Sequence, residues 1–397
     1  MQIPRFIQIH TLHTYPAALL NRDDAGLAKR LPLGNAVRTR ISSQCLKRHW
    51  RVTEDQFALA NLGVPMAIRS RGTLELIRKR IQENGISETL AQTAAEALRE
   101  GGLLDKSGKA KKGEDALKTG QAVLLGRAEI DYLVQRCTEI AGTVADEKSL
   151  EAAIAQMLKD EKKNIEALKH GSGLESSLFG RMVTSDVLAS RDAAVYVGHS
   201  FTVHQAQVEN DYFTVVDDLL QDAGELGSAG IFDTELASGL YYGYVVVDVP
   251  QLVENLEGIA GKECFASGTD AERRALAGRV VQHLLHLIAT VSPGAKRGST
   301  APFDWAKFML VEAGDWQPRS LAGAFHDALP LDDKSGTIRQ RAVNRLSKEI
   351  AAMDDAYGAP LSRRFLSVDP VDIAGAERLN LFKLADWAKE VIEQGAC

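Results

Sequence analysis

Three cations close to the N-terminus are the residues best placed to bind an anion. Lys47, Arg48 and Arg51 fall at positions i, i+1 and i+4 of a predicted helix, so the first and the last share a face. The same helix starts with hydroxyl and amide donors, at the end whose unpaired N–H groups and dipole favour phosphate. These donors are Ser42, Ser43 and Gln44. From these residues alone, phosphate binding and an ordinary capped helix with a solvated basic face are about equally favoured.

Two further segments carry cations in settings that suit a phosphate. Arg22 and Lys29 lie in the polar stretch before the helix and would reach the same anion if that stretch folds over the domain. Lys296 and Arg297 lie between glycines in the sequence PGAKRG, which can form an anion-binding nest. A plain surface turn is as well supported there, and the spacing does not match a P-loop, so nucleotide hydrolysis is not indicated.

Acidic and histidine residues raise two catalytic alternatives. Asp23 and Asp24 would form a metal-binding pair for RNA cleavage, but no third acidic ligand with suitable spacing is evident, and the pair would equally well hold Arg22 in place. His10 and His13 would serve as general acid and base of a metal-independent ribonuclease. Three residues apart on an alternating strand, however, the two histidines face opposite sides.

Metal and disulfide sites find little support. His283 and His286 lie three apart on an apolar helix, and without a third ligand they are interpreted as core or boundary histidines. The cysteines are widely separated, with no CxxC pair, which favours free thiols in a reducing cytosol. They are Cys45, Cys137, Cys264 and Cys397. The N-terminus lacks the apolar region of a signal peptide and no 18-residue apolar run occurs, so we expect a soluble, cytoplasmic protein.

Charge is distributed unevenly along the 397 residues. The net charge of −6 argues by itself against nucleic-acid binding, whose usual footprint is basic. Residues 1–52, however, contain nine Lys and Arg against two acids, a net +7, which leaves −13 for the remainder. A basic N-terminal segment on an acidic body therefore keeps an anionic partner open.

The elements that must position these residues alternate between sheet and helix. The sequence predicts a half-buried strand at Arg5–Leu12, a functional loop at 21–40, and a helix that opens at Ser42. Residues 65–171 show helical periodicity, with a Gly- and Lys-rich loop at 101–113. Later elements are strand-like segments at 194–203 and 239–249, a helix at about 270–290, a loop at 293–299 and a strand at 308–311. Strand, helix and strand in this order indicate an α+β sandwich of ferredoxin type.

Several stretches in fixed order resemble the CasC family, the RNA-binding backbone subunit of the type I-E CRISPR Cascade complex. The first are Asn21-Arg22-Asp23-Asp24 and the run RISSQCLKR at 40–48. The others are SLFGRMVTS at 177–185, DYFTVVDDL at 211–219, SGLYYGY at 238–244 and ATVSPGAKR at 289–297. No single stretch is diagnostic, but their ordered conjunction covers nearly the whole chain.

The resemblance implies a hand-like α+β protein. Its palm is a modified RNA-recognition-motif fold, ferredoxin-like, at 1–60 and 176–397; its helical fingers are an insertion at 61–175; its thumb is a β-hairpin at about 193–225. Several copies assemble head to tail along a CRISPR RNA, beside other Cascade subunits, and each thumb pushes one nucleotide out of line. Target DNA then pairs with the guide between the thumbs, in antiviral defence. No cofactor, metal, membrane or bond-breaking step is implied.

The resemblance also assigns a set of RNA-binding residues. Met182 matches an apolar wedge between bases, and Phe213 with Thr214 matches a contact to the displaced nucleotide, where an aromatic ring stacks without reading base identity. The cations and donors complete the set: Arg22, Lys29, Arg40, Ser42, Ser43, Gln44, Lys47, Arg48, Arg51, Lys296 and Arg297. We therefore expect a non-catalytic RNA-binding scaffold, with a metal-dependent endoribonuclease using Asp23 and Asp24 as the alternative.

Overall fold

The computed structural model describes residues 2–101, 117–119, 122–161, 172–181, 190–216, 228–266, 270–358 and 361–397. Contacts divide the chain into two compact units. The sheet unit comprises Met1–Leu59, Tyr196–Val249 and Ala277–Cys397, and the helical unit comprises Ala60–Val195 and Pro250–Leu276. No helix in the described ranges is both long enough and apolar enough to cross a bilayer.

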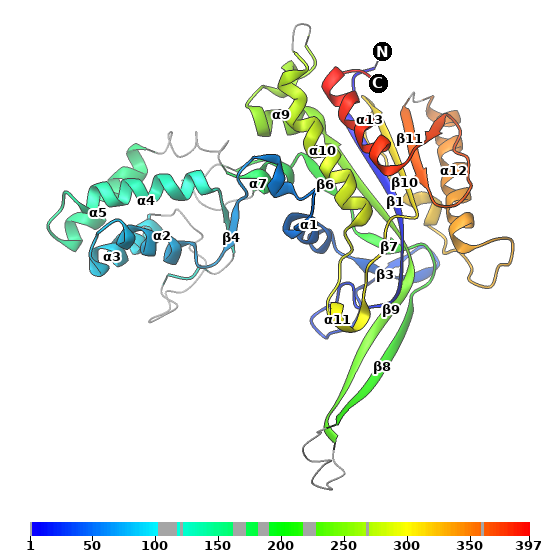
Figure 1. Ribbon diagram of the computed structural model, residues 1–397, viewed down its shortest axis with the longest axis horizontal. Coiled ribbons are helices and arrows are strands. Elements are labelled where there is room, and N and C mark those ends of the chain that lie inside the picture. Colours follow the sequence, from blue (N-terminus) through cyan, green and yellow to red (C-terminus); the bar gives the residue numbers. More distant parts are fainter. Residues whose placement is uncertain are drawn as a thin grey trace. The chain divides into compact units, whose positions relative to one another are not determined.

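The described strands of the sheet unit form one large mixed sheet (Figure 1). Its order is β12-β11-β10-β1-β9-β7-β3-β2, and β6 and β8 also pair with β9. The strands are β1 (Phe6–Ala18), β2 (Arg30–Leu33), β3 (Ala36–Ile41), β6 (Val195–Val197), β7 (Ser200–Thr202), β8 (Gln207–Val216), β9 (Ser228–Asp248), β10 (Phe308–Gly314), β11 (Ser362–Ser367) and β12 (Ala376–Arg378). A mixed α+β fold of this kind fits the expected modified RNA-recognition-motif palm.

The central strand β1 is covered on both faces because its side chains alternate. Leu12 joins an apolar core with Tyr242 of β9, Phe308 of β10 and Leu346 of α12 (Ile338–Tyr357). The opposite face of β1 carries Ile7 and Ile9, both fully buried. Toward the end of β1, the same face packs against helices α1 (Ser43–Val52) and α10 (Glu272–Thr290). The predicted strand is confirmed and extends six residues further, to Ala18. The sheet unit also contains α11 (Arg297–Thr300), η4 (Ala322–Phe325) and α13 (Leu381–Gln394).

The hairpin of β8 and β9 extends away from the rest of the sheet (Figure 1). Its antiparallel register pairs Gln207 with Ser238 at the root and Phe213 with Phe232 further out, and continues to Val216. We call the segment where 207–211 pairs with 234–238 the hairpin root. The residues between the two strands, 217–227, lie outside the described ranges.

The helical unit has a separate apolar core, as the periodicity of its sequence predicts. Leu74, Ile77, Leu98, Leu133 and Ile154 are buried together in this core, and the alanines of α3 let neighbouring helices approach closely. The elements are η1 (Leu59–Leu62), β4 (Ile68–Ser70), α2 (Thr73–Glu83), α3 (Glu88–Glu100), β5 (Val123–Leu125), α4 (Arg127–Ala141), α5 (Glu147–Asp160), α7 (Leu174–Phe179), α9 (Val249–Glu257) and η3 (Gly261–Glu263).

Two of the sequence-based loop predictions are partly wrong. Residues 21–40 include the hairpin β2–β3, because Leu31 and Leu33 alternate inward onto the sheet core. Its turn requires Gly34, whose φ is +58° and where a Cβ atom would lie 1.8 Å from the carbonyl oxygen of His326. The loop predicted at 293–299 ends in the short helix α11, and the strand predicted at 194–203 divides into β6 and β7.

Candidate nucleic-acid interface

Helix α1 begins as the sequence predicts, but its first N–H groups already have partners inside the protein. The hydroxyl of Ser42, the N-cap, accepts from the Cys45 N–H at 3.3 Å. The Ser43 N–H donates to Nδ1 of His199 at 3.1 Å, and the Leu46 N–H donates to the Ser42 carbonyl at 3.2 Å. These bonds satisfy much of the helix start and give Ser42 a capping role, while its expected contact with phosphate stays a prediction.

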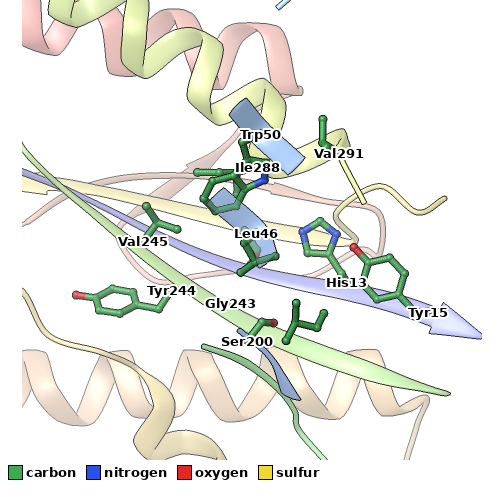
Figure 2. Close-up of a pocket in the computed structure, with 12 residues that line it drawn as sticks. His13, Tyr15, Leu46, Trp50, Ser200, Gly243, Tyr244, Val245, Ile288 and Val291 are labelled. Atoms are coloured by element: carbon green, nitrogen blue, oxygen red, sulfur yellow. The ribbon is translucent and has the colours of Figure 1, made fainter. Parts of the chain in front are cut away.

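The apolar side of α1 fixes which side chains face outward. Leu46 and Trp50 line a small cavity of about 30 Å³ on the sheet, together with Ile288 and Val291, and Figure 2 shows Trp50 next to Ile288 there. At 100° per residue, four polar side chains then fall within an arc of about 100° on the other side of the helix. These are Gln44, Lys47, Arg48 and Arg51, of which Gln44 and Arg48 are exposed and the other two half-buried.

Asn21 joins the preceding loop to the helix. Its side-chain oxygen accepts from the Ser42 N–H at 2.9 Å, and its carbonyl accepts from the Lys29 N–H at 3.0 Å. The Lys29 carbonyl in turn accepts from the Arg40 N–H at 2.7 Å. These backbone contacts hold exposed Arg22 and half-buried Lys29 and Arg40 beside the start of α1, as the sequence-based hypothesis requires.

His49 connects a third basic segment to the same helix. Its Nδ1 lies 2.8 Å from the Cys45 carbonyl, and its Nε2 accepts from the Gly294 N–H at 3.4 Å. The Ala295 N–H donates to the Leu19 carbonyl at 2.8 Å. The exposed cations Lys296 and Arg297 therefore lie at the end of a segment anchored to both α1 and the end of β1. Lys296 has a left-handed backbone, with φ of +49°, which is a strained conformation for a side-chain-bearing residue.

The hairpin of β8 and β9 presents different side chains on its two faces, at its root and further out. Phe213 stacks on Phe232 at 5.6 Å, and the ammonium of Lys296 lies 5.5 Å from the Phe213 ring centre while donating to Oγ1 of Thr234 at 2.8 Å. Thr214 follows Phe213 on the strand and so points to the opposite face. Phe213 and Thr214 therefore do not contact one nucleotide from the same face of the hairpin.

The remaining sequence candidates have mixed placements. Met182 lies outside the described residues, whereas its neighbour Arg181 is buried and forms a two-pronged ion pair with Glu129 at 2.7 and 2.9 Å. Asp23 Oδ1 accepts from the N–H groups of Ala25 and Leu27 at 3.0 and 2.9 Å, so this carboxylate stabilises the turn of its own loop.

The two strand histidines point to opposite faces, as the alternation predicts. His10 contacts the hydroxyl of Tyr242 at 2.9 Å and Glu312 at 3.3 Å on the α12 side, and His13 lines the cavity below α1 (Figure 2). His283 Nδ1 contacts the Phe57 carbonyl at 3.0 Å. Within the described ranges, no three His, Cys, Asp or Glu side chains gather as metal ligands.

Sequence reasoning missed residues that organise the interface through backbone contacts. Glu235, Asn21 and His49 hold the three basic segments, yet each is an ordinary polar residue in its local sequence. Arg38 was counted in the basic N-terminal segment but is fully buried, where its guanidinium donates to the carbonyls of Thr202, Phe325 and His326. No local signal distinguishes Arg38 from half-buried Arg40, since the carbonyls that accept from Arg38 come from distant segments of the chain.

The neighbouring cations also act on two neutral side chains at the start of α1. Burial and then the charges of Arg40 and Lys29 lower the pKa of His199, which keeps this ring neutral and able to accept from the Ser43 N–H. Burial raises the pKa of the Cys45 thiol to about 11, so it stays protonated beside the same helix. The site therefore offers cations and neutral donors from 22–30, 40–51 and 296–297, a set suited to an anionic backbone rather than to a specific base.

Comparisons with known proteins point in the same direction. No curated protein sequence matches the chain. A chain of a solved structure described as "CRISPR RNA-guided surveillance complex, pre-nicking" is 27% identical, with a TM-score of 0.76, over 98% of this chain and 100% of that one. A second, from a "CRISPR RNA-guided surveillance complex", is 25% identical, with a TM-score of 0.67, over 97% and 99%. The family model described as CT1975-like protein matches residues 7–391, and the chain belongs to this family.

Proposed function

We propose that the protein is a non-catalytic CRISPR RNA-binding scaffold, the counterpart of the CasC backbone subunit of type I-E Cascade. Copies polymerise head to tail along the guide, hold its phosphates and display its bases for pairing with target DNA. Other subunits of a surveillance complex are its further partners. The similarity to chains of two such complexes along nearly the whole length supports this assignment.

The observation that carries the proposal is the convergence of three separated basic segments beside the hairpin root. Hydrogen bonds of Asn21 and His49 bring 22–30 and 294–297 to the helix that carries Lys47, Arg48 and Arg51. Cations gathered in this way neutralise successive phosphates without reading sequence. An adjacent hairpin with exposed aromatic residues, including Tyr212 at 64% exposure, supplies surfaces for stacking on a displaced base.

Binding of labelled CRISPR RNA over a range of salt concentrations tests the proposal. If each protomer neutralises about four phosphates, log affinity falls with log salt at a slope of about −3 per protomer. RNA of the same length and scrambled sequence is the control for backbone recognition and binds with a similar slope. Absence of binding, or a slope near zero, contradicts the proposal.

Incubation of the same RNA with Mg²⁺ or Mn²⁺ tests the non-catalytic part. The scaffold protects the RNA stoichiometrically and leaves it intact. Cleavage abolished by Asp23→Ala would instead establish the metal-dependent endoribonuclease. The two turn hydrogen bonds of Asp23 give this carboxylate a structural role, which supports the scaffold.

Nucleotide-resolution probing of the bound RNA tests the sequence-based role of Met182. Met182→Ala is expected to leave the salt slope unchanged, because no charge is removed, while altering nucleotide reactivity at regular intervals along the guide. A probing pattern identical to that of the unmodified protein would count against Met182 as a wedge.

A further inference from the structure

Glu235 is a buried acidic side chain of the hairpin root that contacts the basic segment 28–30. It lies on β9, is 8% exposed, and accepts from the Ala28 N–H through Oε1 at 2.8 Å. Its Oε2 pairs with the guanidinium of Arg30. The negative charge of a carboxylate beside phosphate-binding cations opposes phosphate binding. The contacts of Glu235 with Ala28 and Arg30 indicate that it has a structural role instead.

The contact to Ala28 reaches the RNA-facing cations through the backbone. Ala28 is buried and forms a β-bridge with Arg22, and the next residue, Lys29, is bonded to Asn21. Glu235 thus holds the base of the loop, where Ala28 pairs with Arg22 and precedes Lys29. Arg30 completes the contact by compensating the buried negative charge.

The opposite face of the hairpin root is held by the third basic segment. Thr234 precedes Glu235 on β9, so its side chain points to the other face, where its hydroxyl accepts from Lys296. Lys296 also lies over Phe213 on that face. Segments 21–30 and 293–297, which carry candidate phosphate ligands, therefore contact strand β9 on its two opposite faces.

We propose that Glu235 is a positioning residue which, with Thr234 on the opposite face, clamps the hairpin root between the basic segments 21–30 and 293–297. The clamp sets the direction of the hairpin relative to the bound phosphates, and so sets where along the guide a nucleotide is displaced. This inference rests on the proposed RNA-binding function. Glu235 acts through Ala28 and Arg30 and does not itself contact RNA.

Hydrogen–deuterium exchange of the RNA-free full chain tests the clamp without RNA. Glu235→Ala is expected to speed exchange of the amides in 21–30 by about tenfold, because a buried hydrogen bond to a charged acceptor is lost. Glu235→Gln retains an oxygen acceptor for the Ala28 N–H and is expected to give about a threefold increase. Thr234→Val is expected to increase exchange in 293–297 by about twofold. Glu209→Gln, an exposed acid on the neighbouring strand, is the matched control and leaves both segments unchanged.

Probing of bound CRISPR RNA with the same variants tests the consequence for the guide. Glu235→Ala is expected to blur the regular spacing of displaced nucleotides while lowering RNA affinity by only about threefold, since every cation remains. Glu235→Gln restores most of the spacing, which loss of general stability would not. Unchanged exchange in 21–30, or unchanged spacing, in Glu235→Ala overturns the clamp.

The two readouts separate the clamp from the proposed function. If Glu235→Ala does not fold, Glu235→Gln and Thr234→Val carry the test, and wild-type exchange in both refutes the clamp. If the unmodified protein binds no RNA, the proposed function fails, whereas faster exchange in the variants still supports a clamp of the hairpin root.

Discussion

Two ion pairs contrast how the helical unit and the sheet unit use arginine. In the helical unit, the side chains of Arg181 and Glu129 are 2% and 1% exposed, and the pair is fully enclosed. At the hairpin root of the sheet unit, Glu235 is similarly buried at 7%, but its partner Arg30 is 38% exposed. Both members of the Arg181–Glu129 pair are buried in the interior. In the Arg30–Glu235 pair, a buried acid holds a cation that is partly exposed at the surface.

This difference follows from what each region must do. The helical unit closes on a core of Leu, Ile and Ala, and a charge inside it is tolerated only with its partner in place. The hairpin root must leave cations accessible to an anionic ligand, so it fixes their backbone and leaves their side chains partly solvated. Both regions bury the acid, and burial of the cation is the feature that they do not share.

Removing Arg181 is expected to have the largest effect on stability. Arg181→Ala leaves Glu129 buried and unpaired, which lowers the free energy of unfolding by about 3–5 kcal/mol. Arg30→Ala, the matched change at the hairpin root, is expected to cost less, because water can take the place of the partly exposed Arg30 guanidinium and the Ala28 N–H still donates to Glu235. Urea unfolding measures both variants. Similar losses in the two would remove the contrast between the regions.

Acid is expected to destabilise the sheet unit before the helical unit. Burial lowers the pKa of His13 to about 4, so between pH 6.5 and 4 the folded chain binds fewer protons than the unfolded chain at this residue. Stability from His13 is therefore complete above about pH 6.5, and about 3 kcal/mol is lost as the pH falls to 4. The described residues of the helical unit contain no histidine.

Urea unfolding at several pH values, with hydrogen exchange resolved by segment, checks this order. Loss of protection in β1 and α10 should precede that in α3 and α4 as the pH falls from 6.5 to 5. His13→Gln should take up about one proton fewer on unfolding in this range. Simultaneous loss in both units would contradict the prediction.

Substitutions of Arg38 and Arg40, two residues apart on β3, are expected to affect different properties: stability for Arg38 and RNA binding for Arg40. Arg38→Met leaves three buried carbonyls without their donor and costs about 2–3 kcal/mol of stability. Arg40→Met changes stability by less than about 0.5 kcal/mol but makes the RNA salt slope shallower by about 0.7. Thermal unfolding and salt-dependent RNA binding of both variants test this exchange of roles. Equal slopes for the two would refute the placement of Arg40 at the interface.

The smallest expected effect on stability comes from two cations at separate parts of the interface. Replacing Arg22 and Lys47 together by alanine should make the salt slope shallower by about 1 to 1.5, with the fold intact. Lys334 and Lys348, exposed residues on the α12 side of the sheet, form the matched control pair. An unchanged slope in the Arg22 and Lys47 variant would exclude these residues as phosphate ligands.

Local pattern was sufficient for the elements whose side chains alternate or repeat clearly. The strand from Phe6, the helix Glu272–Thr290 and the Ser42 cap all follow from the spacing of apolar and hydroxyl residues, and the structure confirms them. The β2–β3 hairpin was not predicted because only two alternating apolar residues, Leu31 and Leu33, indicate it. Their burial depends on a sheet core formed by distant segments of the chain. The segments around Met182 and at 217–227 lie outside the described residues, so the wedge stays a prediction.

The sequence by itself determined that nine cations accumulate within residues 1–52 and that their helix starts at a capping serine. Tertiary structure alone decided which of these cations face solvent, because the carbonyls of Thr202, Phe325 and His326 surround the buried Arg38 guanidinium, whereas Arg40 stays partly exposed. It also decided that Ala28 and Lys296, far apart in sequence, contact the adjacent β9 residues Glu235 and Thr234. Charge is a property of composition, whereas accessibility and direction depend on contacts between distant segments, which no local pattern encodes.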